Sequence, residues 1–168
     1  MNIRSKKNCK FVVLGLLMLT AGCRNIDCPL DNTVLVGGKL YPLTEGAVAT
    51  GQDSLLITMV GSDSLLSYQK ASAQIQFPLH YASNRDTLLL NFVRNGRVHT
   101  VDSLFIHHEN NIHFENIDCP PAIFSQLKGV TWSNQPSGRI WVDSVTISSP
   151  IVNYNETENL KIFVHYNN

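Results

Sequence analysis

The sequence feature that most constrains the fold is a series of short apolar runs, each bounded by residues that favour turns. From residue 33 onward the runs are rich in Val, Ile, Leu, Phe, Thr and Tyr, which is typical of β-strands. We expect strands at 33–41, 55–60, 73–79, 87–93, 98–101, 104–108, 112–115, 130–132, 140–147 and 160–166. This pattern predicts an all-β chain, a single antiparallel β-sandwich that is immunoglobulin-like or related. An open barrel is the alternative.

The connections between these strands are predicted to be short turns. Asn95 and Gly96 give the strongest hairpin signal, because both tolerate a positive φ. The residues Glu-Asn-Asn at 109–111 are the next candidate turn. Helix signals are few, although residues 121–129 have a proline near the start and a glycine at the end, and are predicted to form one or two helical turns. Trp132 and Trp141 are expected to pack in the core or against a sheet rather than to bind a ligand.

The N-terminus has the layout of a signal peptide. A basic stretch ends at Lys10, an apolar run covers residues 11–19, and small residues precede Cys23. The apolar run is roughly half of the 20 residues that a transmembrane helix needs. Residues 19–23, Leu-Thr-Ala-Gly-Cys, resemble the lipobox of bacterial lipoproteins, although the position three before the cysteine, where leucine is commonest, is Thr20. The resemblance implies cleavage before Cys23 and acylation of its thiol; an ordinary signal peptide or a retained anchor helix are the alternatives.

These features divide the chain into three parts. We expect a cleaved signal peptide at 1–22, a lipidated tether at 23–32 and a β-sandwich domain at 33–168. Four of the 13 basic residues lie in the first ten positions, so cleavage would leave 9 basic against 13 acidic side chains and a net charge of about −4. A chain with that charge and no basic run is not expected to bind nucleic acid.

The two other cysteines that cleavage would leave lie in matching contexts. Asn-Ile-Asp-Cys-Pro occurs at 25–29, around Cys28, and again at 116–120, around Cys119. In an oxidising compartment such a pair predicts a disulfide between the N-terminal arm and a distant turn. A metal pair, a reactive cysteine with a histidine partner, or two unpaired thiols are the alternatives.

A triplet of Asp, then Ser or Thr, then an aliphatic residue occurs five times. The structural interpretation is that Asp and Ser bind backbone groups where a turn ends, and that the aliphatic residue begins the next strand. The triplet also resembles the acceptor motif of general O-glycosylation in Bacteroidota. That resemblance implies candidate glycan sites at Ser54, Ser64, Thr87, Ser103 and Ser144. The two interpretations are compatible.

The histidine-rich segment 107–113 is the only cluster of candidate metal ligands in the sequence. If residues 109–111 form a turn, His108 and His113 would face each other across a hairpin and Glu109 would supply an oxygen ligand for Zn²⁺. Solvated histidines at strand ends are the commoner case. We therefore expect no metal and no cofactor. No nucleophile elbow, metalloprotease helix, phosphate loop or EF-hand spacing is present, and no catalytic residue is predicted.

Several segments together resemble a family of small lipoproteins from Bacteroidota that has no assigned activity. They are Cys23 with residues 25–29, Asp-Thr-Leu-Leu-Leu at 86–90, Asn-Tyr at 153–154 and Glu-Asn-Leu-Lys-Ile at 158–162. The resemblance implies an outer-membrane lipoprotein. Arg24 to Asp27 contain no acidic run of the kind that marks surface export in this group, which favours a periplasm-facing anchor.

For function, we expect a non-catalytic binding or assembly module with an envelope protein or glycan as its partner. The alternative is a small envelope hydrolase directed at glycans or peptides. A pocket with convergent carboxylates, or a histidine partnered with a serine, would favour the hydrolase. A surface patch of aromatic or apolar side chains would favour binding.

Overall fold

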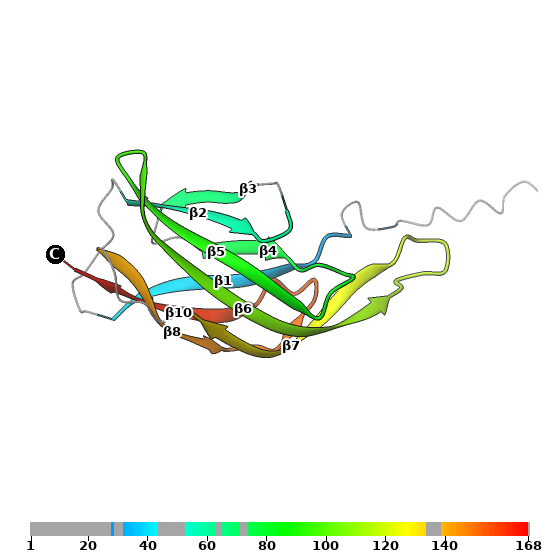
Figure 1. Cartoon of the computed structure of the whole chain (residues 1–168). Coiled ribbons are helices and arrows are strands. Elements are labelled where there is room, and N and C mark those ends of the chain that lie inside the picture. The colour runs from blue at the N-terminus through cyan, green and yellow to red at the C-terminus, as the bar shows by residue number, and fades with distance from the viewer. Residues whose placement is uncertain are drawn as a thin grey trace, which may run out of the picture.

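The protein is described from a computed structural model, which defines residue 28 and residues 32–43, 53–62, 65–70, 74–133 and 139–167. Within these residues the chain forms strands joined by turns and loops, in two sheets that pack as a β-sandwich (Figure 1). The predicted all-β class, with two sheets forming a sandwich, is therefore confirmed. In the same part of the chain no helix is long and apolar enough to cross a membrane. The predicted signal peptide, Cys23 and Ser64 lie outside the described residues.

The smaller sheet has four strands in the order β4-β1-β10-β8. Their bounds are β4 Gln74–Pro78, β1 Leu35–Pro42, β10 Glu158–Tyr166 and β8 Ile140–Ile147. The central pair, β1 and β10, is parallel, although more than a hundred residues separate them in the sequence, and the other two pairs are antiparallel. The register of β1 against β10 shifts between Gly37 and Gly38.

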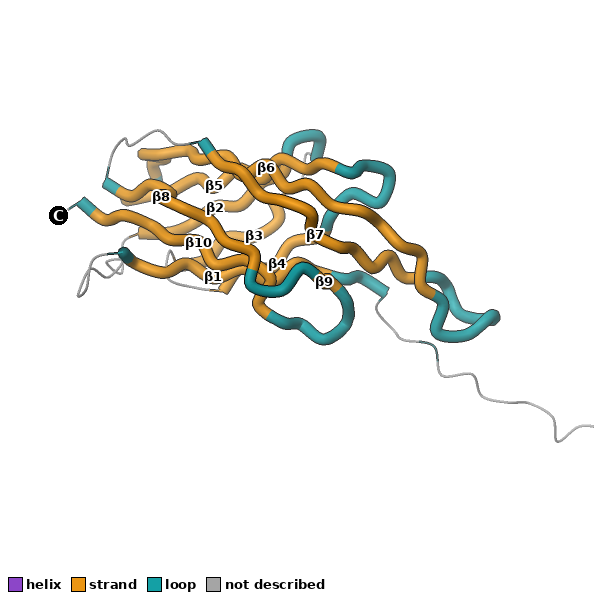
Figure 2. The backbone as a smooth tube through the Cα atoms, turned by 90° about the horizontal axis from the view of Figure 1, so that it is seen from below, coloured by secondary structure: helices purple, strands orange, loops and turns teal. Residues whose placement is uncertain are grey.

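The larger sheet has six antiparallel strands in the order β3-β2-β5-β6-β7-β9. Their bounds are β3 Leu65–Lys70, β2 Asp53–Met59, β5 Arg85–Arg94, β6 Arg97–His113, β7 Ala122–Trp132 and β9 Ile151–Val152. The ends of β6 and β7 that meet at their connection extend beyond the rest of the sandwich (Figure 2). The connection between them covers residues 114–121.

The core lies between the sheets and follows from the alternation of apolar residues along each strand. Leu88, Leu90 and Phe92 of β5 are buried, as are Ile162 and Val164 of β10. Successive side chains of a strand point to opposite faces, so the residues between them point away from the core. The predicted hairpin turn is confirmed, because Asn95 and Gly96 have φ angles of 50° and 73° and join β5 to β6. Both angles fit a type I′ turn.

Three predicted details are wrong. The sandwich is not antiparallel throughout, because β1 and β10 pair in parallel. Residues 109–111 are not a turn but part of β6, which runs without interruption through three of the predicted strands. Residues 121–129 are not helical: all but the first belong to β7, which pairs with β6. The sequence interpretation also missed β3 and the two-residue β9.

Candidate functional site

The outer surface of the smaller sheet carries aromatic and basic side chains side by side. We call it the aromatic face, defined by Lys39, Tyr41, Trp141, Lys161, Phe163 and His165. These residues alternate with buried ones along β1, β8 and β10, so they point away from the core. Tyr41, Trp141 and His165 lie near the strand ends that are opposite the β6–β7 connection (Figure 1).

Two pairs of rings on the aromatic face lie in register across strand boundaries. Tyr41 on β1 is paired with Phe163 on β10, and their ring centroids are 5.8 Å apart. Trp141 on β8 is paired with His165 on β10, and these rings are stacked with centroids 4.4 Å apart. All four side chains are half-buried. Cross-strand aromatic pairs stabilise a sheet modestly, and the rest of each ring surface stays open to a ligand.

The charges of this face are arranged around Tyr41. The Nζ atoms of Lys39 and Lys161 lie 5.2 Å and 5.9 Å from the centroid of its ring, within the range of cation–π attraction. The Tyr41 hydroxyl donates a 2.7 Å hydrogen bond to Oε2 of Glu158. This bond, with a smaller contribution from desolvation, raises the pKa of Tyr41, since ionisation would place two negative charges together. The face therefore offers ring surface, ammonium groups and a neutral phenol.

A second polar group lies inside the sandwich, where His108 is enclosed between Asp86 and Asn110. Its Nε2 is 3.0 Å from Asp86 Oδ2 and its Nδ1 is 2.9 Å from Asn110 Oδ1. Ser125 donates a 2.7 Å hydrogen bond to the same Asn110 oxygen, and His80 contacts Asp86 through both its backbone N–H and its ring. Both ring nitrogens of His108 have protein partners and its side chain is buried, so this network is structural.

The predicted zinc pair does not form. His108 and His113 lie five residues apart on one strand, so they point to opposite faces of the sheet. His113 instead bonds Glu115, with 3.1 Å between Nε2 and Oε1, and stacks on Phe124 at 4.2 Å. Among the described residues no group of three or more His, Cys, Asp or Glu side chains is placed to hold a metal ion.

The four described triplet sites lie within strands rather than at the ends of turns. Ser54, Thr87, Ser103 and Ser144 are half-buried residues of β2, β5, β6 and β8. Two of the preceding aspartates are buried: Asp86 joins the His108 network, and Asp102 accepts the backbone N–H of Val142 at 2.8 Å. The structural interpretation is right for Asp86, which binds the N–H of His80 in the preceding turn, and wrong for Asp102, whose partner is on the other sheet.

Burial also affects the ionisation of Asp102. Desolvation raises the pKa of this carboxyl, and the hydrogen bonds from Val142 and Ser133 offset part of the effect. The sequence carries a signal for Asp102, because an acidic residue stands there at a position that is apolar in the alternating pattern of β6. No comparable signal marks the aromatic face, which depends on the pairing of strands distant in sequence.

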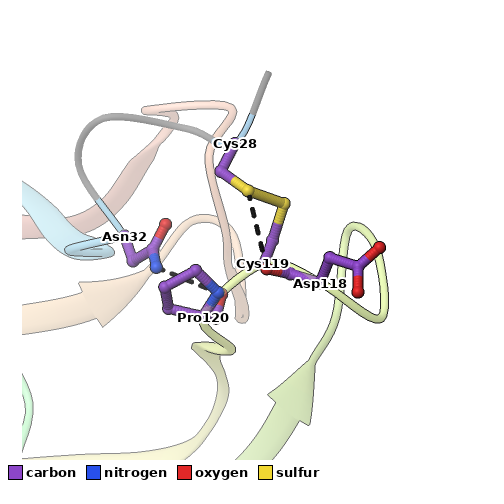
Figure 3. The surroundings of a disulfide bond; sticks show 5 residues. All are labelled: Cys28, Asn32, Asp118, Cys119 and Pro120. Atoms are coloured by element: carbon purple, nitrogen blue, oxygen red, sulfur yellow. Dashed lines mark hydrogen bonds between the residues drawn. A yellow bond between two sulfur atoms is a disulfide. The ribbon is translucent and has the colours of Figure 1, made fainter. Parts of the chain in front are cut away.

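The two cysteines in matching contexts form a disulfide, as the sequence predicts. Cys28 and Cys119 are bonded across 91 residues of sequence, with their Cα atoms 5.5 Å apart (Figure 3). A hydrogen bond of 3.1 Å from Asn32 Nδ2 to the Pro120 carbonyl oxygen holds the same two segments together. Cys119 lies in the β6–β7 connection, so the N-terminal arm is fixed to the projecting end of the sandwich.

One cavity among the described residues has a volume of about 200 Å³. It is lined by Phe92, Val93, Arg94, His99, Thr100, Arg139 and Ile140. Small-molecule sites usually measure about 300–1,000 Å³. None of these lining residues is a carboxylate, so the cavity does not provide the paired acids that a glycan hydrolase uses.

Comparison with known proteins gives one match. The match is to a family model described as a family of unknown function, DUF6452, and it covers residues 54–164. This region contains β3 to β9, all but the first residue of β2 and all but the last two residues of β10, and it excludes β1. No curated protein and no solved structure matches the chain. The chain therefore belongs to the family of unknown function DUF6452.

Proposed function

We propose that this protein is a non-catalytic binding module of the bacterial cell envelope, anchored to the outer membrane by acyl groups on Cys23. The observation that carries the proposal is the aromatic face, where Tyr41, Trp141, Phe163 and His165 point outward from a sheet whose other face supplies the core. Surface tyrosine, tryptophan and phenylalanine side chains are typical of binding surfaces.

The ligand that fits this face best is an envelope glycan. Aromatic rings stack against the apolar faces of sugar rings, and the rings of Tyr41 and Phe163 lie side by side across two strands. The ammonium groups of Lys39 and Lys161 can bind acidic substituents, while the Tyr41 hydroxyl and Glu158 can hydrogen-bond to hydroxyl groups. The cavity described above also has rings and cations in its lining, Phe92, His99, Arg94 and Arg139, but its volume of about 200 Å³ is small for a glycan.

Two observations support an envelope location. Cys23 follows a segment that resembles a lipobox, and disulfides such as Cys28–Cys119 persist in oxidising compartments. The resemblance to lipoproteins from Bacteroidota points in the same direction, and the absence of an acidic run after Cys23 favours a periplasm-facing anchor. Acylation with two or more chains would give stable attachment, because each buried methylene contributes about 0.8 kcal/mol.

The test compares two phenylalanines on opposite sheets. Three full-length proteins are compared in detergent: Phe163→Ala, Phe105→Ala and the unsubstituted protein. Each is titrated with lipopolysaccharide and, separately, with peptidoglycan fragments. Phe105 is a matched control, because it is also half-buried and points outward, but on the larger sheet beneath Arg85. If Phe163 is a central contact, Phe163→Ala weakens binding by about 30-fold, which corresponds to about 2 kcal/mol.

The outcomes separate the parts of the proposal. Retained binding by Phe105→Ala together with loss in Phe163→Ala supports the aromatic face as the site. Equal affinity in all three proteins contradicts it. Failure of the unsubstituted protein to bind either probe contradicts an envelope glycan as the ligand.

The triplet serines and threonines are proposed as O-glycosylation sites in addition to their place in the strands. Thr87 gives the clearest test, because its side chain points outward while Asp86 before it is buried. Thr87→Ala should remove one glycan from the intact mass of protein from native membranes and leave its thermal unfolding little changed. An unchanged mass would exclude Thr87 as an acceptor.

A further inference from the structure

We propose that the connection between β6 and β7 inserts its apolar side chains into the surface of the bilayer that holds the lipid anchor. The inference rests on the proposed acylation of Cys23. We call this connection together with the end of β6 the hairpin tip, and define it by Ile112 at the end of β6 and by Phe114 and Ile117 in the connection. The acyl groups on Cys23 would hold the protein at the membrane, and contact between the hairpin tip and the bilayer would orient the domain.

The hairpin tip exposes apolar surface that the fold does not use. Ile117 is 91% exposed, Ile112 66% and Phe114 58%, and all three lie within six residues of one another. Tyr81, in the turn before β5, is 78% exposed. Asn110 of β6 holds this turn against the strand, because its Nδ2 donates a 3.0 Å hydrogen bond to the Tyr81 carbonyl oxygen. Apolar side chains with a tyrosine beside them are the composition of a membrane-interface contact.

The disulfide limits how far this tip can be from the membrane. Five residue steps separate Cys23 from Cys28, and a fully extended chain of that length spans about 17 Å. Cys28 is bonded to Cys119, and their Cα atoms are 5.5 Å apart. Cys119 follows Ile117 by two residues in the sequence. The acyl chains on Cys23 would start at the bilayer surface, so the tether cannot move the hairpin tip far from that surface.

The base of the hairpin is packed, so the tip is presented rather than collapsed onto the domain. His113 stacks on Phe124 at 4.2 Å, and Phe124 meets Tyr154 edge-on at 5.1 Å. β6 and β7 extend past the other strands toward this end, whereas β10 ends at the opposite end of the sandwich (Figures 1 and 2). With the hairpin tip at the membrane, most of the aromatic face would lie toward the end of the sandwich that points away from the membrane.

The charges of the tip indicate which lipids it would meet. Glu115 and Asp118 are exposed beside the apolar residues, and the basic group nearest in sequence, His113, is bonded to Glu115. Acidic side chains would be repelled by anionic lipids, so the contact is expected to depend on apolar insertion into a zwitterionic surface. Insertion of this kind reaches about 5–10 Å into the boundary between headgroups and acyl chains.

The test places a tryptophan at each end of the sandwich in turn. Lipidated full-length protein carrying Ile117→Trp or Val98→Trp is reconstituted in vesicles of phosphatidylethanolamine and phosphatidylcholine, with or without brominated phosphatidylcholine. Val98 is the matched control, because it is also an exposed aliphatic residue, at the Asn95–Gly96 end of β6. The native Trp132 and Trp141 are common to both proteins.

The fluorescence of each introduced tryptophan is the difference between the variant and the unsubstituted protein. We expect this fluorescence to be blue-shifted and quenched by brominated lipid in Ile117→Trp, and not to be quenched in Val98→Trp. Flotation of the same vesicles reports attachment separately. If the Ile117→Trp protein floats and the fluorescence of its introduced tryptophan is not quenched, the inference is overturned and the lipid anchor stays in place. Protein that does not float overturns the anchor and the inference together.

Discussion

Asp86 of β5 and His108 of β6 meet inside the sandwich, with Oδ2 of the carboxylate 3.0 Å from Nε2 of the imidazole. The His108 side chain is fully buried and that of Asp86 is 3% exposed. The same carboxylate accepts the backbone N–H of His80 at 2.9 Å, and Asn110 holds the turn that contains His80. One buried pair therefore fixes the turn before β5 against the middle of β6.

Removing one partner of this pair should destabilise the fold strongly. Asp86→Ala leaves His108 and the His80 N–H without their acceptor, and we expect the free energy of unfolding to fall by about 3–5 kcal/mol. Urea unfolding followed by tryptophan fluorescence measures the loss. Asp143→Ala, at an exposed aspartate of β8, is the control and should change stability by less than about 0.5 kcal/mol. Similar small losses in both variants would contradict a structural role for the pair.

Asp102 should give the fold a distinctive dependence on pH. Burial raises the pKa of Asp102, so the folded chain holds this proton more tightly than the unfolded chain. Its contribution to stability is fully present below the ordinary pKa of 3.8 and is lost as pH rises through the raised folded-state value. Asp102→Asn has no such loss, so its stability relative to the unsubstituted protein should increase between about pH 4 and pH 7. Urea midpoints at the two pH values test this, and a constant or decreasing difference would contradict it.

Gly37 should tolerate a side chain poorly, although its φ is not positive. A Cβ at this position would lie 2.8 Å from the Thr157 carbonyl oxygen, where the β1–β10 register shifts. We expect Gly37→Ala to cost about 1–3 kcal/mol, the usual effect of overpacking. Gly129→Ala is the matched control within a strand, because nothing lies within 4 Å of its Cβ position. Thermal unfolding distinguishes the two, and equal midpoints would show that β1 and β10 can move apart.

The disulfide should contribute substantially to stability. Closing a loop of about 90 residues stabilises by roughly 4 to 5 kcal/mol on the chain-entropy model, which sets an upper value. Cys28→Ser and Cys119→Ser combined should therefore lower the free energy of unfolding by several kcal/mol while the two sheets still form. Urea unfolding with and without reductant provides the comparison. An unchanged midpoint on reduction would show that the N-terminal arm is not fixed to the β6–β7 connection in solution.

The sequence predicts those parts of the fold that depend on local pattern. Alternation identifies most of the strands, Asn95 and Gly96 identify their hairpin, and the repeated context of Cys28 and Cys119 identifies the disulfide. The prediction fails at β6, because His108 and Asn110 are polar residues on the inner side of the strand. In the sequence these polar residues resemble a turn between two strands. Their hydrogen bonds with Asp86 and Ser125 explain how polar side chains are buried within one continuous strand.

The aromatic face could not be predicted for a different reason. Tyr41 and Phe163 meet because β1 and β10 pair in parallel, and no local pattern indicates that pairing. The hairpin tip is similar, since a single Ile117 in a polar segment does not stand out until its exposure and the position of Cys119 are known. Contacts between distant segments thus determine both candidate surfaces.

The most direct test of the account is the intact mass of the protein purified from its native membrane, measured beside a Cys23→Ala variant. The account predicts a chain that begins at Cys23, carries added acyl mass and gains the mass of two hydrogen atoms when reductant converts the Cys28–Cys119 bond to two thiols. The Cys23→Ala variant should lack the acyl mass and leave the membrane fraction. A water-soluble product with the bare mass of the polypeptide would contradict the anchor, and with it the proposed orientation of the domain at the membrane.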